Sequence, residues 1–418
     1  MSVFPKIEKI TLDISISHFL LMFGYKLFSL YFPLFLIWRG LSLPQVGYTY
    51  LLIYLPIAVF APLVGFFSHK INPVILATMG IFGYGIYCLG MILVPVSFLF
   101  YFFQVFLGIS AALFFVSMRG ILMGAKLENP NRAFAWFYSS PYYADAIAPA
   151  VGALIIWQFN FFGVFALSLI IQFFNAIFCI SQLRKNTFNF STVTKSSDRA
   201  ILSQQKRYTL AKNKNFSFKE FNQNYQKVFE VLKKKTILIP IVVSFSVLLL
   251  AGFYRAFFVL FLKNLEWSQN LILLFVSLLS LVFLPISLFA IKRIGKLKSQ
   301  KNVFQGAAIS GALSIVLGGL GVFANFYTIF LVKFGQSIGG LMSGSGRSGL
   351  LSQKLKEHPE EAGAIDTIFS PLGVALGSLV AGLIIGFLGF NNLFIFGGIF
   401  VVAVAIIGKG LFQKHRFS

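Results

Sequence analysis

Apolar stretches of about twenty residues alternate with short polar segments along almost the whole chain. A helix needs roughly 20 mostly apolar residues to cross a bilayer, so each stretch predicts one membrane span. Twelve stretches qualify: 13–37, 45–67, 74–94, 97–120, 134–156, 161–182, 237–262, 270–291, 303–323, 326–347, 363–386 and 391–411. None has the alternating ten-residue pattern of a membrane barrel. The sequence therefore predicts an all-α integral membrane protein with twelve transmembrane helices.

Composition agrees with this pattern. The chain is 57% hydrophobic and 17% aromatic, and only 11% of its residues are charged, against roughly 25% in soluble domains. A water-soluble fold of this size could not bury so much apolar surface. The N-terminus lacks the order of a cleavable signal peptide, so the first apolar stretch should remain as a span. Cys88 and Cys179 lie inside apolar stretches, and we expect neither a disulfide nor a metal site from them.

Lys and Arg are distributed unevenly over the predicted loops. With the N-terminus inside, most of the 35 fall in cytoplasmic segments, only two lie outside (Arg39 and Lys263), and the rest lie within or at the ends of spans. Cytoplasmic loops carry an excess of these residues. We therefore expect a multi-pass protein of the plasma membrane with both termini cytoplasmic. The net charge of +23 follows from this topology, and no nucleic-acid partner is expected.

The segment 183–236 is the one long polar interruption of the apolar pattern. It carries thirteen Lys and Arg against three acidic residues. In residues 216–235 apolar side chains recur at helical spacing, which predicts a basic amphipathic helix lying on the inner leaflet. The predicted organisation is a six-helix bundle in residues 1–182, a cytoplasmic linker in 183–236 and a second six-helix bundle in 237–418.

The two predicted bundles repeat the same local pattern. The fourth and tenth spans each end in an arginine that is followed seven residues later by a lysine, then by a glutamate and a proline: Arg119, Lys126, Glu128, Pro130, and Arg347, Lys354, Glu357, Pro359. The second span of each bundle has a proline eight residues before a basic residue: Pro62 before Lys70, and Pro285 before Arg293. Parallel six-helix repeats of this kind occur in secondary transporters. The pattern predicts two pseudo-symmetric halves.

These segments resemble the major facilitator superfamily over nearly the whole chain. Residues 38–70 are similar to the outer loop, the second span and the start of a loop signature of the form G-x-x-x-D-x-x-G-R-K/R, where Gly65 matches the first Gly and His69 stands at the acidic position. Ala148, Pro149 and Gly152 resemble the Gly-Pro-x-x-Gly element of the exporter branch. The resemblance implies rocker-switch alternating access, with a small-molecule substrate bound between the halves by spans 1, 4, 5, 7, 10 and 11.

Ionisable residues inside the predicted spans are the best candidates for a site, because charges in a bilayer are costly and usually face a cavity or a partner. Lys26 and Asp145 lie roughly 20 Å and 18 Å into their spans at 1.5 Å per residue, which predicts an ion pair. That pair would be either static or broken by protonation of Asp145 or by substrate. The candidate substrate-binding residues are Tyr25, Lys26, Tyr142, Tyr254, Arg255 and Lys333.

A second group of candidates lies at the predicted cytoplasmic ends of spans. Arg119, Arg347, Lys70 and Arg293 are expected to act in a gate or to anchor loops, rather than to bind substrate. His18, one turn inside the first span, is expected to be packed or at an interface rather than to relay protons.

The basic candidates bear on the substrate. Lys26 and Arg255 occupy similar places in the two halves, and each directly follows a tyrosine. A desolvated phosphate or carboxylate needs compensating cations, and Arg can hold it with two parallel hydrogen bonds. The arrangement resembles the organophosphate:phosphate antiporter branch of the superfamily, which implies an anionic or zwitterionic substrate.

The predicted function is a secondary active transporter for a small solute, with an exchanged or co-transported ion. A lipid or lysolipid flippase and a drug exporter on the same fold remain open. A membrane-embedded enzyme or scaffold is disfavoured, because the sequence has no His/Cys cluster with metal-ligand spacing and the outer loops are short. We expect a monomer without cofactor, metal or enzyme activity; the Gly-rich stretch 340–349 lies in a span, where small residues favour helix packing.

Overall fold

The computed structural model describes residues 6–41, 43–183 and 218–414, which form helices joined by short loops. The first half contains α1 (Lys9–Ser29), α2 (Phe32–Trp38), α3 (Leu43–Ser68), α4 (Pro73–Leu93), α5 (Phe98–Gly124), α6 (Pro130–Phe178) and the π-helical turn η1 (Cys179–Leu183). The second half contains α10 (Lys235–Asn264), α11 (Gln269–Lys296), α12 (Ser299–Gly319), the short 3₁₀ turn η3 (Gly321–Phe323), α13 (Phe326–Lys354) and α14 (Pro359–Lys414). Between the halves lies α9 (Phe218–Lys233).

Two of these helices each contain two spans. The backbone of α6 breaks at Asn160, and that of α14 breaks at Gly389, both with a positive φ. A left-handed residue cannot continue a right-handed helix, so each long helix divides into two arms. The first span is also divided, because a turn separates α1 from α2. Counted this way, the described residues form the twelve predicted spans, and the all-α fold class is confirmed.

The amphipathic helix predicted within the linker is present as α9. Part of its apolar side is covered, since Tyr225, Val228 and Leu232 are buried while Phe229 is 52% exposed. Its ring-to-ring contacts reach α3 through Phe221 and Phe66. The helix therefore packs against the bundles as well as following the predicted amphipathic pattern. Residues 184–217 of the linker lie outside the described part of the chain.

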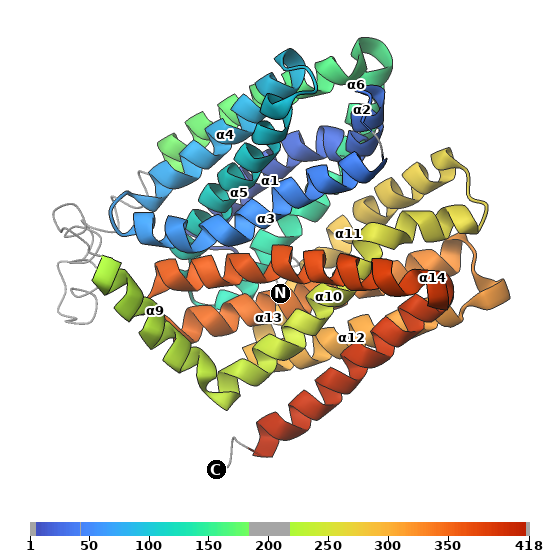
Figure 1. Ribbon diagram of the computed structural model, residues 1–418. Helices are drawn as coiled ribbons and strands as arrows, with labels where there is room; N and C mark the ends of the chain where they lie inside the picture. Colours follow the sequence, from blue (N-terminus) through green and yellow to red (C-terminus); the bar gives the residue numbers. More distant parts are fainter. Residues whose placement is uncertain (1–5, 42, 184–217, 415–418) are drawn as a thin grey trace.

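Figure 1 shows the two halves side by side, with α1–α6 above α10–α14 and α9 across one end of both. We call the end at which α9 lies the linker end, and the other the far end. The helices α3, α5, α11 and α13 finish at the linker end, and α6, α12 and α14 begin there. The sequence analysis predicts that this end is cytoplasmic.

Within each half, the first and fifth spans touch through a glycine. A Cβ at Gly152 of α6 would lie 1.9 Å from the carbonyl oxygen of Leu27 in α1. A Cβ at Gly377 of α14 would lie 2.0 Å from the carbonyl oxygen of Leu249 in α10. Small residues allow membrane helices to approach this closely. The repeat seen in the sequence thus recurs as a repeated backbone contact.

Replacing Gly377 with Ala should therefore destabilise the protein, because the methyl group would collide with backbone that cannot move aside. Overpacking of this kind costs about 1–3 kcal/mol. Gly386→Ala is the matched control, since nothing lies within 4 Å of a Cβ at this other helical position of α14. Thermal unfolding of the purified proteins should show a lower melting temperature for Gly377→Ala only. Equal melting temperatures for the two variants would contradict the proposed packing.

Candidate functional site

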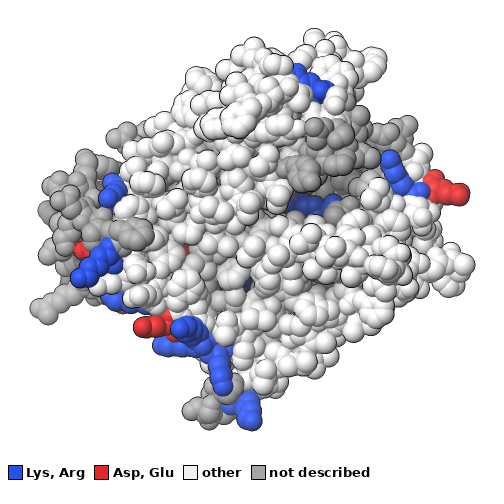
Figure 2. All heavy atoms as spheres, viewed as in Figure 1, with Lys and Arg blue, Asp and Glu red and all other residues white. Residues whose placement is uncertain are grey.

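The molecule is hollowed between its two halves, and Figure 2 shows Lys or Arg atoms inside the hollow. Arg255 of α10 is exposed although it lies within a predicted span. Its guanidinium carbon stands 5.3 Å from the ring centroid of Tyr54, which belongs to α3 in the other half. Arg255 has no ion pair among the residues that the structure describes. It therefore faces the opposite half as a cation that forms no direct ion pair with a described residue.

Lys26 and Asp145 form an ion pair between α1 and α6. The Lys26 ammonium lies 2.8 Å from one carboxylate oxygen of Asp145 and 3.1 Å from the other. Their side chains are 17% and 24% exposed, so solvent reaches the pair. The two helices bring the charges together because they pack along one another. Whether the pair switches during transport stays a prediction.

The tyrosine candidates lie around these charges. Tyr25 meets Phe28 and Tyr84 edge-on, with ring centroids 5.3 Å and 6.2 Å away. Tyr142 packs across the halves, with its ring centroid 4.5 Å from that of Phe283 in α11. Both tyrosines are only partly buried. They give the space between the halves an aromatic wall that carries hydroxyl groups.

Lys333 of α13 is a second cation without a carboxylate in the described part of the chain. Its ammonium lies 3.7 Å from the ring centroid of Tyr254 and 4.6 Å from that of Phe258. It donates a 3.0 Å hydrogen bond to the side chain of Gln336, whose amide in turn donates to the Tyr254 hydroxyl. Ring faces and one amide oxygen attract an ammonium but do not neutralise it.

At the linker end, a fully buried carboxylate joins the halves. Asp366 of α14 accepts a 2.8 Å hydrogen bond from Arg347 Nε of its own half, and Ser348 donates another at 2.6 Å. From the first half, the Tyr138 hydroxyl donates at 2.9 Å, and Arg119 Nε lies 3.6 Å away. Both arginines predicted as gate residues therefore meet on one aspartate. We call these five side chains the gate cluster.

The gate cluster is built from equivalent positions of the repeat. Tyr138 follows Arg119 by nineteen residues, and Asp366 follows Arg347 by the same interval. Sequence reasoning missed Asp366, whose side chain is 0% exposed. The shared nineteen-residue interval was the available signal. Tyr138 and Ser348 were also missed as members of the cluster.

Further contacts between the halves surround the gate cluster. Asn131 at the start of α6 donates to the Leu297 carbonyl at 3.0 Å and accepts from Ser299 at 2.8 Å. His69 Nε2 lies 2.7 Å from Glu361 Oε1. The pair nearest the far end is Tyr143 with Ser287, at 2.8 Å, and beyond it the described residues make no hydrogen bond between the halves. The molecule is thus closed at the linker end.

The remaining candidates take no part in this closure. Lys70 places its ammonium 4.7 Å from the ring centroid of Phe66 in its own half. Arg293 is exposed and forms no ion pair with a described residue. His18 is 2% exposed; its Nδ1 lies 3.0 Å from the Phe137 carbonyl oxygen, and its ring stacks on Phe137. His18 is therefore packed, one of the two expected roles.

The surroundings of α9 complete the linker end. Asn224 of α9 donates a 2.9 Å hydrogen bond to Glu361 Oε1. Burial and the nearby Glu361 carboxylate raise the pKa of the Tyr225 hydroxyl well above its usual value, so Tyr225 stays protonated. In the neighbouring loop, a 2.6 Å hydrogen bond from Lys6 lowers the pKa of the Glu128 carboxyl.

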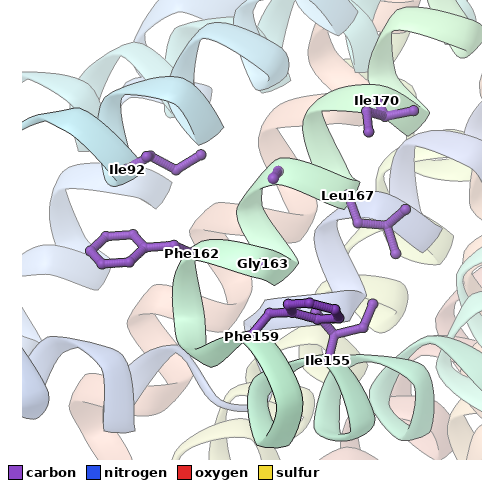
Figure 3. Close-up of a pocket in the computed structure, with 8 residues that line it drawn as sticks. Ile92, Ile155, Phe159, Phe162, Gly163, Leu167 and Ile170 are labelled. Atoms are coloured by element: carbon purple, nitrogen blue, oxygen red, sulfur yellow. The ribbon is translucent and has the colours of Figure 1, made fainter.

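A separate hollow lies beside the break in α6, as Figure 3 shows. Its lining is apolar and comes from α4 and both arms of α6, with Ile92, Ile155, Phe159, Phe162, Leu167 and Ile170 among the lining residues. It contains none of the candidate residues. The charged space between the halves is therefore the better candidate for a solute site.

The family model described as Major Facilitator Superfamily matches residues 14–345. The chain belongs to this superfamily. Its members are transporters rather than enzymes, and the family supports secondary transport as the general activity of this chain. No curated protein sequence matches the chain.

Solved structures of transporters share the fold of this superfamily member. The proton:xylose symporter XylE, solved with 6-bromo-6-deoxy-D-glucose, has a TM-score of 0.71 at 14% identity and covers 96% of this chain and 94% of its own. The human organic anion transporter MFSD10 (TETRAN) has a TM-score of 0.68 at 13% identity, covering 97% and 99%. The E. coli fucose:proton symporter FucP has a TM-score of 0.69 at 12% identity, covering 96% and 98%. These identities show a common fold and leave the substrate open.

Removing the central carboxylate of the gate cluster should open the linker end. In Asp366→Asn, Arg347 and Arg119 lose the carboxylate that compensates them, and an unpaired buried charge costs about 3–5 kcal/mol. A cysteine placed at Ser352, which is 4% exposed, should then react faster with a maleimide, and the melting temperature should fall. The control is Glu230→Gln, which neutralises an exposed acid on α9. Unchanged labelling in Asp366→Asn would show that the cluster does not hold the halves together.

Proposed function

We propose that this superfamily member carries a small anionic solute across the membrane by alternating access, binding it between the halves. The observation that carries the proposal is Arg255, an exposed cation within a span, without a carboxylate partner in the described residues and facing Tyr54 of the opposite half. A cation in a bilayer is costly unless it faces a cavity or a partner. An anionic solute is such a partner.

The other charged residues around the hollow also favour a negatively charged substrate. Lys333 contributes a second basic group, whose ammonium contacts aromatic rings and Gln336 among the described residues. Lys26 is compensated by Asp145, so it can hold a solute only when that pair opens. Three basic side chains, Arg255, Lys333 and Lys26, thus stand against one carboxylate, Asp145. A phosphate or carboxylate group would reduce this excess.

The gate cluster supports alternating access. Its partners come from both halves, and the contacts between the halves lie toward the linker end. This corresponds to a state in which the proposed site communicates with the far side. Rotation of the halves would separate Asp366 from Arg119 and Tyr138 while Arg347 and Ser348 stay with it, because these two belong to the same half.

Whether transport is coupled to a proton depends on whether Asp145 of the Lys26–Asp145 pair becomes protonated during the cycle. If a proton drives transport, Asp145 is the partly exposed carboxylate that can take it up within the hollow, since Asp366 is buried and accepts hydrogen bonds from Arg347, Ser348 and Tyr138. If the protein exchanges one anion for another, the pair needs no proton. Transport into proteoliposomes with and without a pH gradient separates these two forms of the proposal.

Replacing Arg255 with Gln should weaken binding of the transported anion by about tenfold or more, because a charge-assisted hydrogen bond contributes about 1.5–3 kcal/mol. Lys26→Gln should weaken it as well. The measurement is ligand-induced thermal stabilisation over a panel of small phosphates and carboxylates, followed by uptake and efflux assays with the ligands that bind. Lys263→Gln, which removes an exposed cation beyond the hollow, serves as the control. An identified substrate whose affinity survives both Arg255→Gln and Lys26→Gln would refute the two-cation site.

We propose further that the linker end is cytoplasmic in a plasma-membrane protein, on the strength of the uneven distribution of Lys and Arg. Gln226 on α9 and Glu266 in the loop after α10 are both exposed, and the native cysteines are buried. A membrane-impermeant maleimide added to intact cells should label a cysteine at Glu266 and leave one at Gln226 unlabelled. Labelling of Gln226→Cys from outside would reverse the orientation.

A further inference from the structure

We propose that His69, Glu360 and Glu361 form a binding site for a divalent transition-metal ion, and that the bound ion ties the two halves together at the linker end. His69 follows α3 in the first half, whereas Glu360 and Glu361 lie in the first turn of α14 in the second. The site is separate from the hollow that holds Arg255. The proposal does not depend on the nature of the transported solute.

The three side chains are close enough to share an ion. One ligand atom of each, a ring nitrogen or a carboxylate oxygen, lies within 4.8 Å of the others. Zinc bonds to nitrogen and oxygen at about 2.0–2.1 Å, which places tetrahedral ligands about 3.3 Å apart. The close contact between His69 Nε2 and Glu361 Oε1, at 2.7 Å, would lengthen slightly to admit the ion, and Glu360 would move inward.

A second observation indicates that Glu361 can bind a cation. The Glu361 side chain is 0% exposed, yet its Oε2 atom has no hydrogen-bond partner among the described residues. A buried oxygen without a donor is costly, and a metal ion would satisfy it. The other oxygen, Oε1, is already held by Asn224 of α9 at 2.9 Å. Such a contact fixes the orientation of a carboxylate that binds a metal.

The ligand types indicate which ions fit. One imidazole and two carboxylates suit Zn²⁺ and neighbouring transition metals, whereas Mg²⁺ and Ca²⁺ prefer oxygen ligands alone. The start of α14 contributes about half a positive charge from the helix dipole, which opposes a cation. The two carboxylates supply the negative ligand charge that a divalent ion requires.

The simpler account of the cluster is a hydrogen bond between His69 and Glu361 that joins the halves without a metal. That hydrogen bond gives Glu361 Oε1 a partner and leaves Oε2 without one. A metal ion bound by the carboxylate would give both oxygens a partner. Because the ligands come from both halves, the complete site exists only while the linker end is closed. An ion at 100 times its dissociation constant would favour that state by about 100-fold.

The test is a calorimetric titration of Zn²⁺ into the full-length protein with any affinity tag removed. His69→Gln is the informative variant, because a glutamine amide can still donate to Glu361 but cannot bind zinc well. We expect one site per chain in the wild type and an affinity at least tenfold lower in His69→Gln. His358→Gln, a histidine just before α14 and outside the cluster, should bind as the wild type does.

Hydrogen–deuterium exchange supplies an independent measurement. Zn²⁺ should slow exchange in residues 65–72 and 359–366 of the wild type, and should have no such effect in His69→Gln. Glu360→Gln provides a second variant if His69→Gln proves unstable, and it should also lower the affinity. The proposal is overturned if wild-type protein binds no zinc at a defined site, if the His69 and Glu360 variants bind it equally well, or if His358→Gln abolishes binding.

Discussion

The gate cluster depends on one electrostatic constraint, which is that a carboxylate removed from water must be matched by donors and cations. Asp366 meets this constraint with groups from both halves, so its own desolvation is compensated only when the halves are together. A buried ion pair contributes little net stability when complete and is costly when broken. The constraint therefore selects the arrangement in which the halves meet at the linker end. It contributes little to the stability of each half by itself.

The two repeat-related contacts that close the linker end use different side chains. Where α6 begins, Asn129 donates to the Gly295 carbonyl at the end of α11, and Asn131 donates to the Leu297 carbonyl in the loop that follows. At the equivalent start of α14, an ionisable pair takes the place of these neutral amides, with His69 against Glu361 and α9 alongside. Duplication accounts for the common geometry. The different side chains mean that solution conditions can act on one contact and leave the other unchanged.

Much of the fold could be predicted from the sequence, because lipid imposes a length and a composition on every span. The boundaries within α6 and α14 were also predictable, since Asn160 and Gly389 are residues that tolerate a positive φ. The burial of Asp366 could not be predicted from the sequence. Asp366 lies near the start of its span, and it is α5 and α6 of the other half that bury it. The His69–Glu361 contact could not be predicted from the sequence either, because the two residues are 292 positions apart in the chain.

One helix differs from its neighbours in composition. Of the described helices, nine are long and apolar enough to cross a membrane by those criteria alone, and α13 is not one of them. It carries Lys333 and Arg347, along with many Gly and Ser residues, and a basic residue at the centre of a span opposes insertion by about 2.5–3.5 kcal/mol. The helix is held by α6, α11 and α12. We therefore expect the insertion of α13 into the membrane to depend on its neighbouring helices more than that of the apolar spans does.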